Sequence, residues 1–145
     1  MNLEIDVSDK YNDTEINIRC PAIDEEVNSV INLINGLNGY IIVKRNDKTE
    51  KLRFDSICYF ESVDEQTFVY TEKDVYRCKE KLYEIEDMFR ESSFIRISKA
   101  CILNIDYLES VKASLNGRLE AKLLNGERII INRHYVSGFK KKFGL

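Results

Sequence analysis

The segment Phe94–Ser110, "FIRISKACILNIDYLES", decides how the rest of this 145-residue chain is interpreted. Its apolar residues are typical of a buried strand or core segment, yet polar and charged side chains interrupt them at Arg96, Ser98, Lys99 and Asn104. Because a buried polar group costs free energy unless it finds a partner, these four residues need a structural or functional reason. The pattern therefore predicts a buried strand or core segment in which an arginine and a lysine have a specific purpose.

The composition is typical of one globular domain in water, with 43% hydrophobic and 32% charged residues. No apolar run approaches the roughly 18 residues that a membrane-spanning helix needs. The first ten residues, MNLEIDVSDK, have neither the basic start nor the apolar stretch of a signal peptide. We therefore expect a cytoplasmic protein without direct membrane insertion.

Residues that carry metal or catalytic chemistry are sparse. The four cysteines are at least 20 positions apart, and His134 is the single histidine. The sequence contains no nucleophile elbow, phosphate-binding glycine loop or zinc-protease motif. We therefore expect no metal site, no cofactor, no disulfide and no enzymatic activity, with reduced and mostly buried thiols.

Charge is distributed unevenly along the chain. The whole sequence has a net charge of −3, but residues 1–39 carry two basic and eight acidic residues, whereas residues 40–145 carry 20 basic and 17 acidic residues. The last 18 residues, from Arg128, include five basic residues and no acidic one. A local basic surface that attracts phosphates is thus compatible with the acidic average, although a run of lysines near a terminus is also typical of a solvated helix.

The patterns of the first 39 residues predict a short β-β-α segment. Leu3–Val7 and Glu15–Cys20 alternate apolar and polar residues, which is typical of strands. Asp24 is a suitable N-cap for a helix with an apolar stripe, and Gly36 or Gly39 could end that helix.

From Tyr40 the patterns predict mostly strands. They are short and rich in β-branched or aromatic residues, and two Asn-Gly pairs, at 116–117 and 125–126, predict tight turns of a meander. Residues 80–89 predict a helix with one apolar face, and residues 133–143 predict a final helix.

Four co-linear pieces of this second part are similar to the LytTR DNA-binding domain, a module of bacterial transcription factors. They are "ICYFES" (57–62), "VYTEKDVYRCKEKLYEIE" (69–86), "FIRISKACILNIDYLES" (94–110) and "LLNGERIIINRHYVSGFKKKF" (123–143). The resemblance implies an α+β fold, mostly β with flanking helices, in an elongated arrangement of small antiparallel sheets. The chain would then divide into an acidic segment, 1–39, and a LytTR-like domain, 40–145.

The resemblance also implies that loop residues, rather than a recognition helix, enter the grooves of double-stranded DNA. The family's contact positions fall on Gln66 or Thr67, on Lys99 and on Arg133. Further expected contacts are Arg96, as a structural residue or phosphate contact, Ser98 and Asn132, where many relatives have His and Ser respectively, and Lys140, as a phosphate contact.

The resulting prediction is a sequence-specific transcription regulator that acts as a homodimer or as paired copies on repeated sites.

A segment of 39 residues is too short for the receiver domain that many LytTR regulators carry, and some small regulators of this family are paired with a restraining membrane protein. Packing on the module, dimerisation and binding of such a partner all remain open for the acidic segment. The alternative function is a protein-interaction module that keeps the fold without binding DNA.

Overall fold

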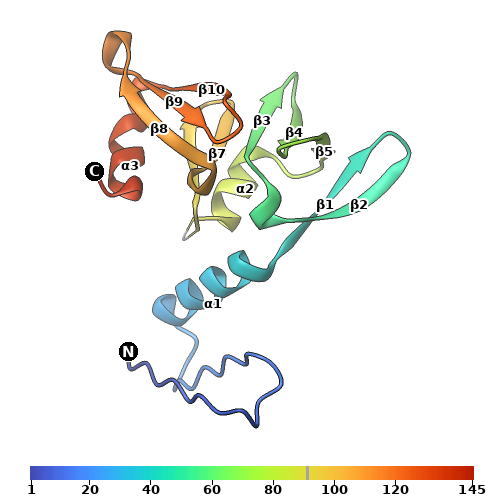
Figure 1. Ribbon diagram of the computed structural model, residues 1–145, viewed down its shortest axis with the longest axis vertical. Helices are drawn as coiled ribbons and strands as arrows, with labels where there is room; N and C mark the ends of the chain where they lie inside the picture. The colour runs from blue at the N-terminus through green and yellow to red at the C-terminus, as the bar shows by residue number, and fades with distance from the viewer. Residues whose placement is uncertain (91) are drawn as a thin grey trace.

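The computed structural model describes residues 1–90 and 92–145, in which antiparallel strands predominate over helices (Figure 1). The helices and strands are α1 (Glu25–Asn38), β1 (Tyr40–Arg45), β2 (Lys48–Arg53), β3 (Tyr59–Val63), β4 (Gln66–Tyr70), β5 (Val75–Cys78), α2 (Leu82–Met88), β6 (Phe94–Ser98), β7 (Cys101–Asn104), β8 (Leu108–Ala113), β9 (Leu119–Leu123), β10 (Arg128–Ile131) and α3 (Arg133–Phe143). Short 3-10 turns are η1 (Phe54–Ser56), η2 (Ile105–Tyr107) and η3 (Leu115–Gly117). The predicted mostly-β fold with flanking helices is confirmed.

Two antiparallel sheets organise the part of the chain that the structure describes. The larger has the strand order β2-β1-β5-β4-β3-β7-β6, and the smaller has the order β10-β9-β8, which is the predicted meander. Asn116 and Gly117 both have positive φ, as a tight turn requires, but they lie within the longer η3 connection rather than in a two-residue hairpin. The β3–β4 hairpin instead turns at Asp64 and Glu65, which adopt positive φ without glycine.

The core consists of two apolar clusters, and β7 belongs to both. Ile102 packs with Phe60, Phe89 and other residues of the first cluster, whereas its neighbour Leu103 lies in the second. Successive side chains of a strand point to opposite faces of the sheet, so β7 is buried on both sides. This explains why Phe94–Ser110 has a dense apolar pattern: its strands pass between the two clusters.

Each cluster is closed by a helix. On α2, Leu82 and Ile85 contribute to the first cluster, while Phe139 on α3 belongs to the second, together with residues of the three-stranded sheet. The final helix predicted from the sequence is thus confirmed, and Gly138 does not interrupt it. None of the helices in the described part of the chain has the length and apolar character needed to cross a membrane.

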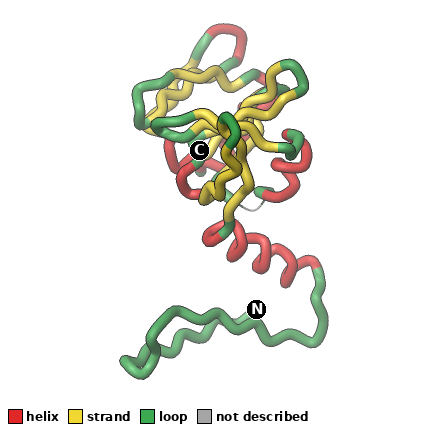
Figure 2. Tube along the Cα trace, turned by 90° about the vertical axis from the view of Figure 1, so that its right-hand side faces the viewer, coloured by secondary structure: helices red, strands yellow, loops and turns green. Residues whose placement is uncertain are grey.

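The acidic segment differs from its prediction in the part that precedes α1. Asp24 caps α1 as expected, because its carboxylate accepts a hydrogen bond from the Val27 amide at 3.0 Å. However, residues 1–24 form no strand, and Figure 2 shows them as a loop that extends beyond α1, away from the sheets. The prediction of strands at Leu3–Val7 and Glu15–Cys20 is therefore wrong. Alternation indicates only that one face is apolar, and a strand also needs a partner for its backbone groups, which these residues do not have in the described chain.

Candidate nucleic-acid interface

Three connections that the sequence singled out lie next to one another in the fold. The amide of Ser62, near the end of β3, donates to the carbonyl of Ala100 in the β6–β7 turn at 2.8 Å. The amide of Asn132, between β10 and α3, donates to the carbonyl of Ile97 in β6 at 2.9 Å. These two backbone hydrogen bonds attach the β3–β4 end and the β10–α3 junction to β6 and its turn, which carries Lys99.

The first position is the β3–β4 hairpin, where Gln66 and Thr67 were both candidates. Gln66 is exposed at the start of β4, and its side-chain oxygen accepts a hydrogen bond from Arg77 at 3.5 Å. Thr67 is only 3% exposed, because the alternation of β4 turns it into the sheet framework. The expectation for Thr67 is corrected accordingly: of the two, Gln66 is the residue accessible to a partner.

The second position is the two-residue turn between β6 and β7. Lys99 is exposed there, and the adjoining Ser98 is half-buried. The hydroxyl oxygen of Ser98 accepts a hydrogen bond from the Ala100 amide at 3.2 Å, so this side chain already supports the turn. Lys99 thus presents the ammonium group, while Ser98 has an internal contact.

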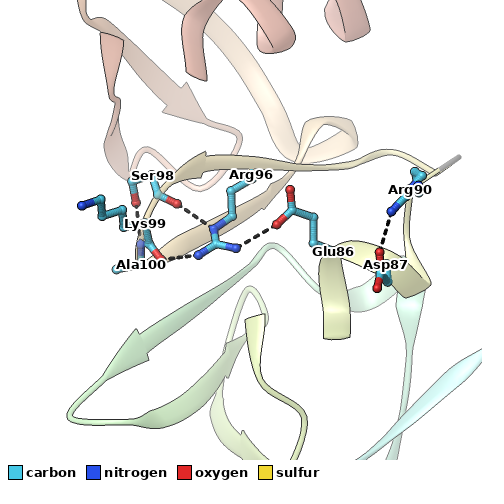
Figure 3. Close-up of polar contacts among 7 residues, drawn as sticks. All are labelled: Glu86, Asp87, Arg90, Arg96, Ser98, Lys99 and Ala100. Atoms are coloured by element: carbon cyan, nitrogen blue, oxygen red, sulfur yellow. Dashed lines mark hydrogen bonds and ion pairs between the residues drawn. The ribbon is translucent and has the colours of Figure 1, made fainter. Parts of the chain in front are cut away.

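Arg96 does not point into solvent as a phosphate contact would. Its side chain is 19% exposed and forms an ion pair with Glu86 of α2, with 2.8 Å between the guanidinium nitrogen Nη1 and the carboxylate (Figure 3). Its Nε donates to the Ser98 carbonyl at 2.8 Å. Of the two expected roles for Arg96, these contacts support the structural one.

The third position is the start of α3. Arg133 is the first residue of the helix and is exposed, and Asn132 is the half-buried N-cap without a side-chain capping bond. Arg133 forms no ion pair within residues 1–90 and 92–145. No ion pair among the described residues therefore occupies the Arg133 guanidinium group.

Sequence reasoning missed the residue that supports the Arg133 side chain. Gly117 has φ +73°, and a Cβ at this position would approach the Arg133 Cδ to 3.0 Å. The stem of Arg133 therefore passes directly over the glycine backbone of η3. The Asn116-Gly117 pair was recognised as a turn signal, but nothing in its pattern relates it to a residue 16 positions further on.

The three lysines of α3 are not equivalent. Lys140 and Lys141 are exposed, whereas the Lys142 ammonium donates to the Phe94 carbonyl at 2.7 Å and to the Arg90 carbonyl at 3.3 Å. Lys142 thus attaches α3 to the start of β6. Lys140 stays available for a solvent-exposed contact.

Neighbouring acidic residues limit the basic surface. Arg128 forms an ion pair with Glu120 at 2.7 Å, and the hydrogen bond from Arg128 lowers the pKa of that carboxyl below its usual value. At the β3–β4 turn, the exposed Asp64 and Glu65 directly precede Gln66. Phosphates are therefore favoured near Lys99, Arg133 and Lys140 rather than at this turn.

A cleft of about 670 Å³ lies between α2, β6 and α3. Its lining includes Glu86 and Arg96, which form the ion pair described above, and His134. Within the described residues, no group of three histidine, cysteine or carboxylate side chains is arranged to hold a metal ion.

Comparisons with known proteins agree with this geometry. The family described as the LytTr DNA-binding domain matches residues 47–144. The solved LytTr DNA-binding domain of a Bacillus cereus protein, described as a methyl-accepting/DNA response regulator, superposes with a TM-score of 0.69 at 26% sequence identity. The superposition covers 73% of this chain and 97% of the Bacillus domain.

Curated relatives extend the similarity to the full length. Proteins named as uncharacterized HTH-type transcriptional regulators, from Staphylococcus aureus strains MSSA476 and MW2, are each 26% identical over 147 residues, which cover 100% of this chain and 99% of theirs. The described part of the present chain contains no two helices joined by a short turn, because strands separate α1, α2 and α3. The family match, the common fold and the regulators aligned end to end lead to one conclusion: this chain belongs to the LytTR family of DNA-binding transcription regulators.

Proposed function

We propose that this protein is a sequence-specific, double-stranded-DNA-binding transcription regulator that inserts loop residues into DNA grooves. The observation that carries the proposal is that the Ser62–Ala100 and Asn132–Ile97 backbone hydrogen bonds attach two connections, the β3–β4 end and the β10–α3 junction, to the third, the β6–β7 turn with its strand β6. Each connection has an exposed side chain able to donate to bases or phosphates: Gln66, Lys99 and Arg133. Base reading by loops on a rigid sheet does not require a recognition helix.

In this proposal the side chains have different tasks. Arg133 and Lys99 project from rigid backbone and contact base edges, where an arginine or lysine pairs well with guanine O6 and N7. Lys140 contacts phosphate, because an ammonium on a flexible stem carries no base-specific geometry. Ser98 and Asn132 are both half-buried, and they contact the DNA at the edge of this surface.

A salt-dependent titration tests the proposal. We expect the protein to bind a fluorescence-labelled duplex from its own promoter region. The affinity should fall steeply between about 50 and 200 mM salt, because each contact with a phosphate releases counterions from the DNA. Lys99→Ala should weaken binding to this duplex. Lys48→Ala is the control and should leave the affinity unchanged, because Lys48 lies on β2, at the opposite edge of the larger sheet from β6. Absence of binding at low salt, or a flat salt response, would favour the alternative of a protein-interaction module.

We further propose that two copies act together on repeated sites in the cytoplasm. Support comes from residues 1–24, whose apolar side chains Leu3, Ile5 and Val7 are 86%, 75% and 88% exposed. A second copy of this chain would cover them. Light scattering of the free protein should give the mass of two chains, and Ile5→Asp should reduce it to the mass of one. A free protein with the mass of one chain would contradict dimerisation through this segment. Two copies would then come together only on DNA with repeated sites, and a duplex with one site would bind one copy.

A regulatory membrane-protein partner is also compatible with this exposed segment. Co-purification of full-length protein with solubilised membranes, compared with a variant that lacks residues 1–24, tests it. Equal recovery of both proteins would contradict a partner that binds this segment.

A further inference from the structure

The guanidinium group of Arg96 connects α2 to the turn that carries Lys99. Nη1 donates to the Glu86 carboxylate at 2.8 Å, Nε donates to the Ser98 carbonyl at 2.8 Å, and Nη2 donates to the Lys99 carbonyl. All three nitrogens are therefore engaged by acceptors of the protein. Figure 3 shows the side chain extending between the turn and Glu86.

These hydrogen bonds hold the backbone on both sides of Lys99. Arg96 binds two successive carbonyl groups, those of Ser98 and Lys99, and the third, of Ala100, accepts from the Ser62 amide at 2.8 Å. A register irregularity of the β6–β7 pair lies between Arg96 and Ser98, where regular strand pairing alone does not define the backbone direction. Arg96 therefore contributes to the orientation of the turn from which the Lys99 side chain leaves.

An arginine is required for this geometry. Its planar fork has N–H groups in several fixed directions, whereas a lysine would offer one ammonium group that cannot reach Glu86 and two carbonyls in the same way. Loss of the fork would leave acceptors without their partners in a half-buried site, which is more costly than the loss of an exposed ion pair.

We propose that Arg96 is a positioning residue for DNA reading: with Glu86 it fixes the turn so that Lys99 meets its base at a defined angle. The proposal rests on the proposed contact of Lys99 with DNA. In this proposal Arg96 does not contact phosphate. Helix α2 has no residue at the interface, yet it contributes to the choice of DNA sequence because Glu86 holds Arg96.

Two substitutions separate positioning from direct contact. Arg96→Lys preserves the charge, so a phosphate contact would be largely retained, whereas a positioning role predicts about a tenfold loss of preference for the cognate duplex over one with altered bases. The salt dependence of binding should stay unchanged. Glu86→Gln removes the charge of the acidic partner of Arg96. It should lower the same preference if Arg96 positions the turn, and leave the preference unchanged if Arg96 contacts phosphate, because a phosphate contact carries no base information.

Arg90→Gln is the matched control, because Arg90 forms an ion pair with Asp87 at 2.6 Å on the same helix region but does not contact the turn (Figure 3). It should leave the preference unchanged. Retained preference in Arg96→Lys, retained preference in Glu86→Gln, or an equal loss of preference in Arg90→Gln would each overturn the proposal. Glu86 has a side chain that is 52% exposed, so Glu86→Gln remains informative even if the Arg96 variant does not fold.

A measurement without DNA distinguishes this proposal from the proposed function. Amide hydrogen exchange of Ala100, whose N–H donates to the Ser98 hydroxyl, should accelerate in Arg96→Lys and not in Arg90→Gln. An unchanged exchange rate of the Ala100 amide in Arg96→Lys would show that Arg96 does not stabilise the turn. Faster exchange with no effect of Lys99→Ala on DNA binding would instead refute the DNA contact of Lys99, and with it the positioning role.

Discussion

Arg133 and Lys140 are basic side chains of one helix that lie in different surroundings. Arg133 begins α3 at the end of a strand, and its stem lies against Gly117, so few conformations are open to its planar group. Lys140 is exposed in the last turn of the helix. Position along the helix, rather than charge, is what separates them.

Arg133→Ala should therefore cost about 1–3 kcal/mol of binding free energy on the cognate site and much less on random DNA, because a base contact is lost. Lys140→Ala should weaken both complexes about equally. Titrations with both duplexes, together with melting temperatures, test this difference. Equal weakening of both duplexes by Arg133→Ala, or a clearly lower melting temperature, would remove Arg133 as a base-reading residue.

Gly117 and Gly126 offer a matched pair to test the support beneath Arg133. Both have positive φ, so Gly117→Ala and Gly126→Ala should each lower the free energy of unfolding by about 1 kcal/mol. Only Gly117→Ala places a Cβ against Arg133, since no atom lies within 4 Å of a Cβ at Gly126. We expect DNA preference to fall in Gly117→Ala alone. A similar loss in both variants would mean that general destabilisation, not the displaced arginine, is responsible.

Among the elements, α1 and the loop before it are the part that the family domain does not require. The Bacillus domain is covered to 97%, yet it matches only 73% of this chain, and the family match begins at residue 47. Among the residues whose burial the structure describes, the side chains of the two apolar clusters come from position 41 onward.

A variant of residues 40–145 should therefore fold and bind DNA. Removal of a net charge of −6 should also strengthen non-specific binding, because the acidic segment repels the phosphate backbone. Circular dichroism and titration with random duplex test both expectations. An unfolded variant would show that α1 is needed by the sheet, and unchanged non-specific affinity would show that the acidic charges lie too far from DNA to matter.

Taken as one molecule, the protein keeps three of its thiols in environments that disfavour the thiolate. Burial raises the pKa of Cys58 from 9.0 to about 11, and those of Cys78 and Cys101 to about 12, with further contributions from nearby carboxylates. Burial likewise raises the pKa of Tyr70 from 10.0 to about 12. These groups prefer their neutral forms in the folded state.

This preference predicts that stability decreases in alkaline solution. Above about pH 9 the unfolded chain loses thiol protons while the folded chain retains them, so stability that is fully present below pH 9 is lost as the pH rises toward 11–12. Urea midpoints at pH 8, 9, 10 and 11 should fall progressively. Cys58→Ala and Cys101→Ala should each flatten the profile, and a constant midpoint across this range would contradict the argument.

Much of the architecture was encoded in local patterns. Period-two alternation and the apolar face of residues 80–89 predicted strands and helices, because these features depend on neighbours a few positions apart. The co-linear family pieces located the turn at Lys99 and the strand end before Arg133. Tertiary contacts decided what local patterns do not specify. Alternation did not reveal that residues 1–24 lack a partner strand, nor that Thr67 faces inward while Gln66 faces out.

Arg96 shows the physical reason most clearly. In the sequence it is one more basic residue within a strand, compatible with a phosphate contact or a structural role. Its function depends on Glu86, ten positions earlier on another element, and on two carbonyl groups that the turn brings within reach. A side chain's charge follows from the sequence, but the acceptors that it meets exist only once the strands and helices are packed together.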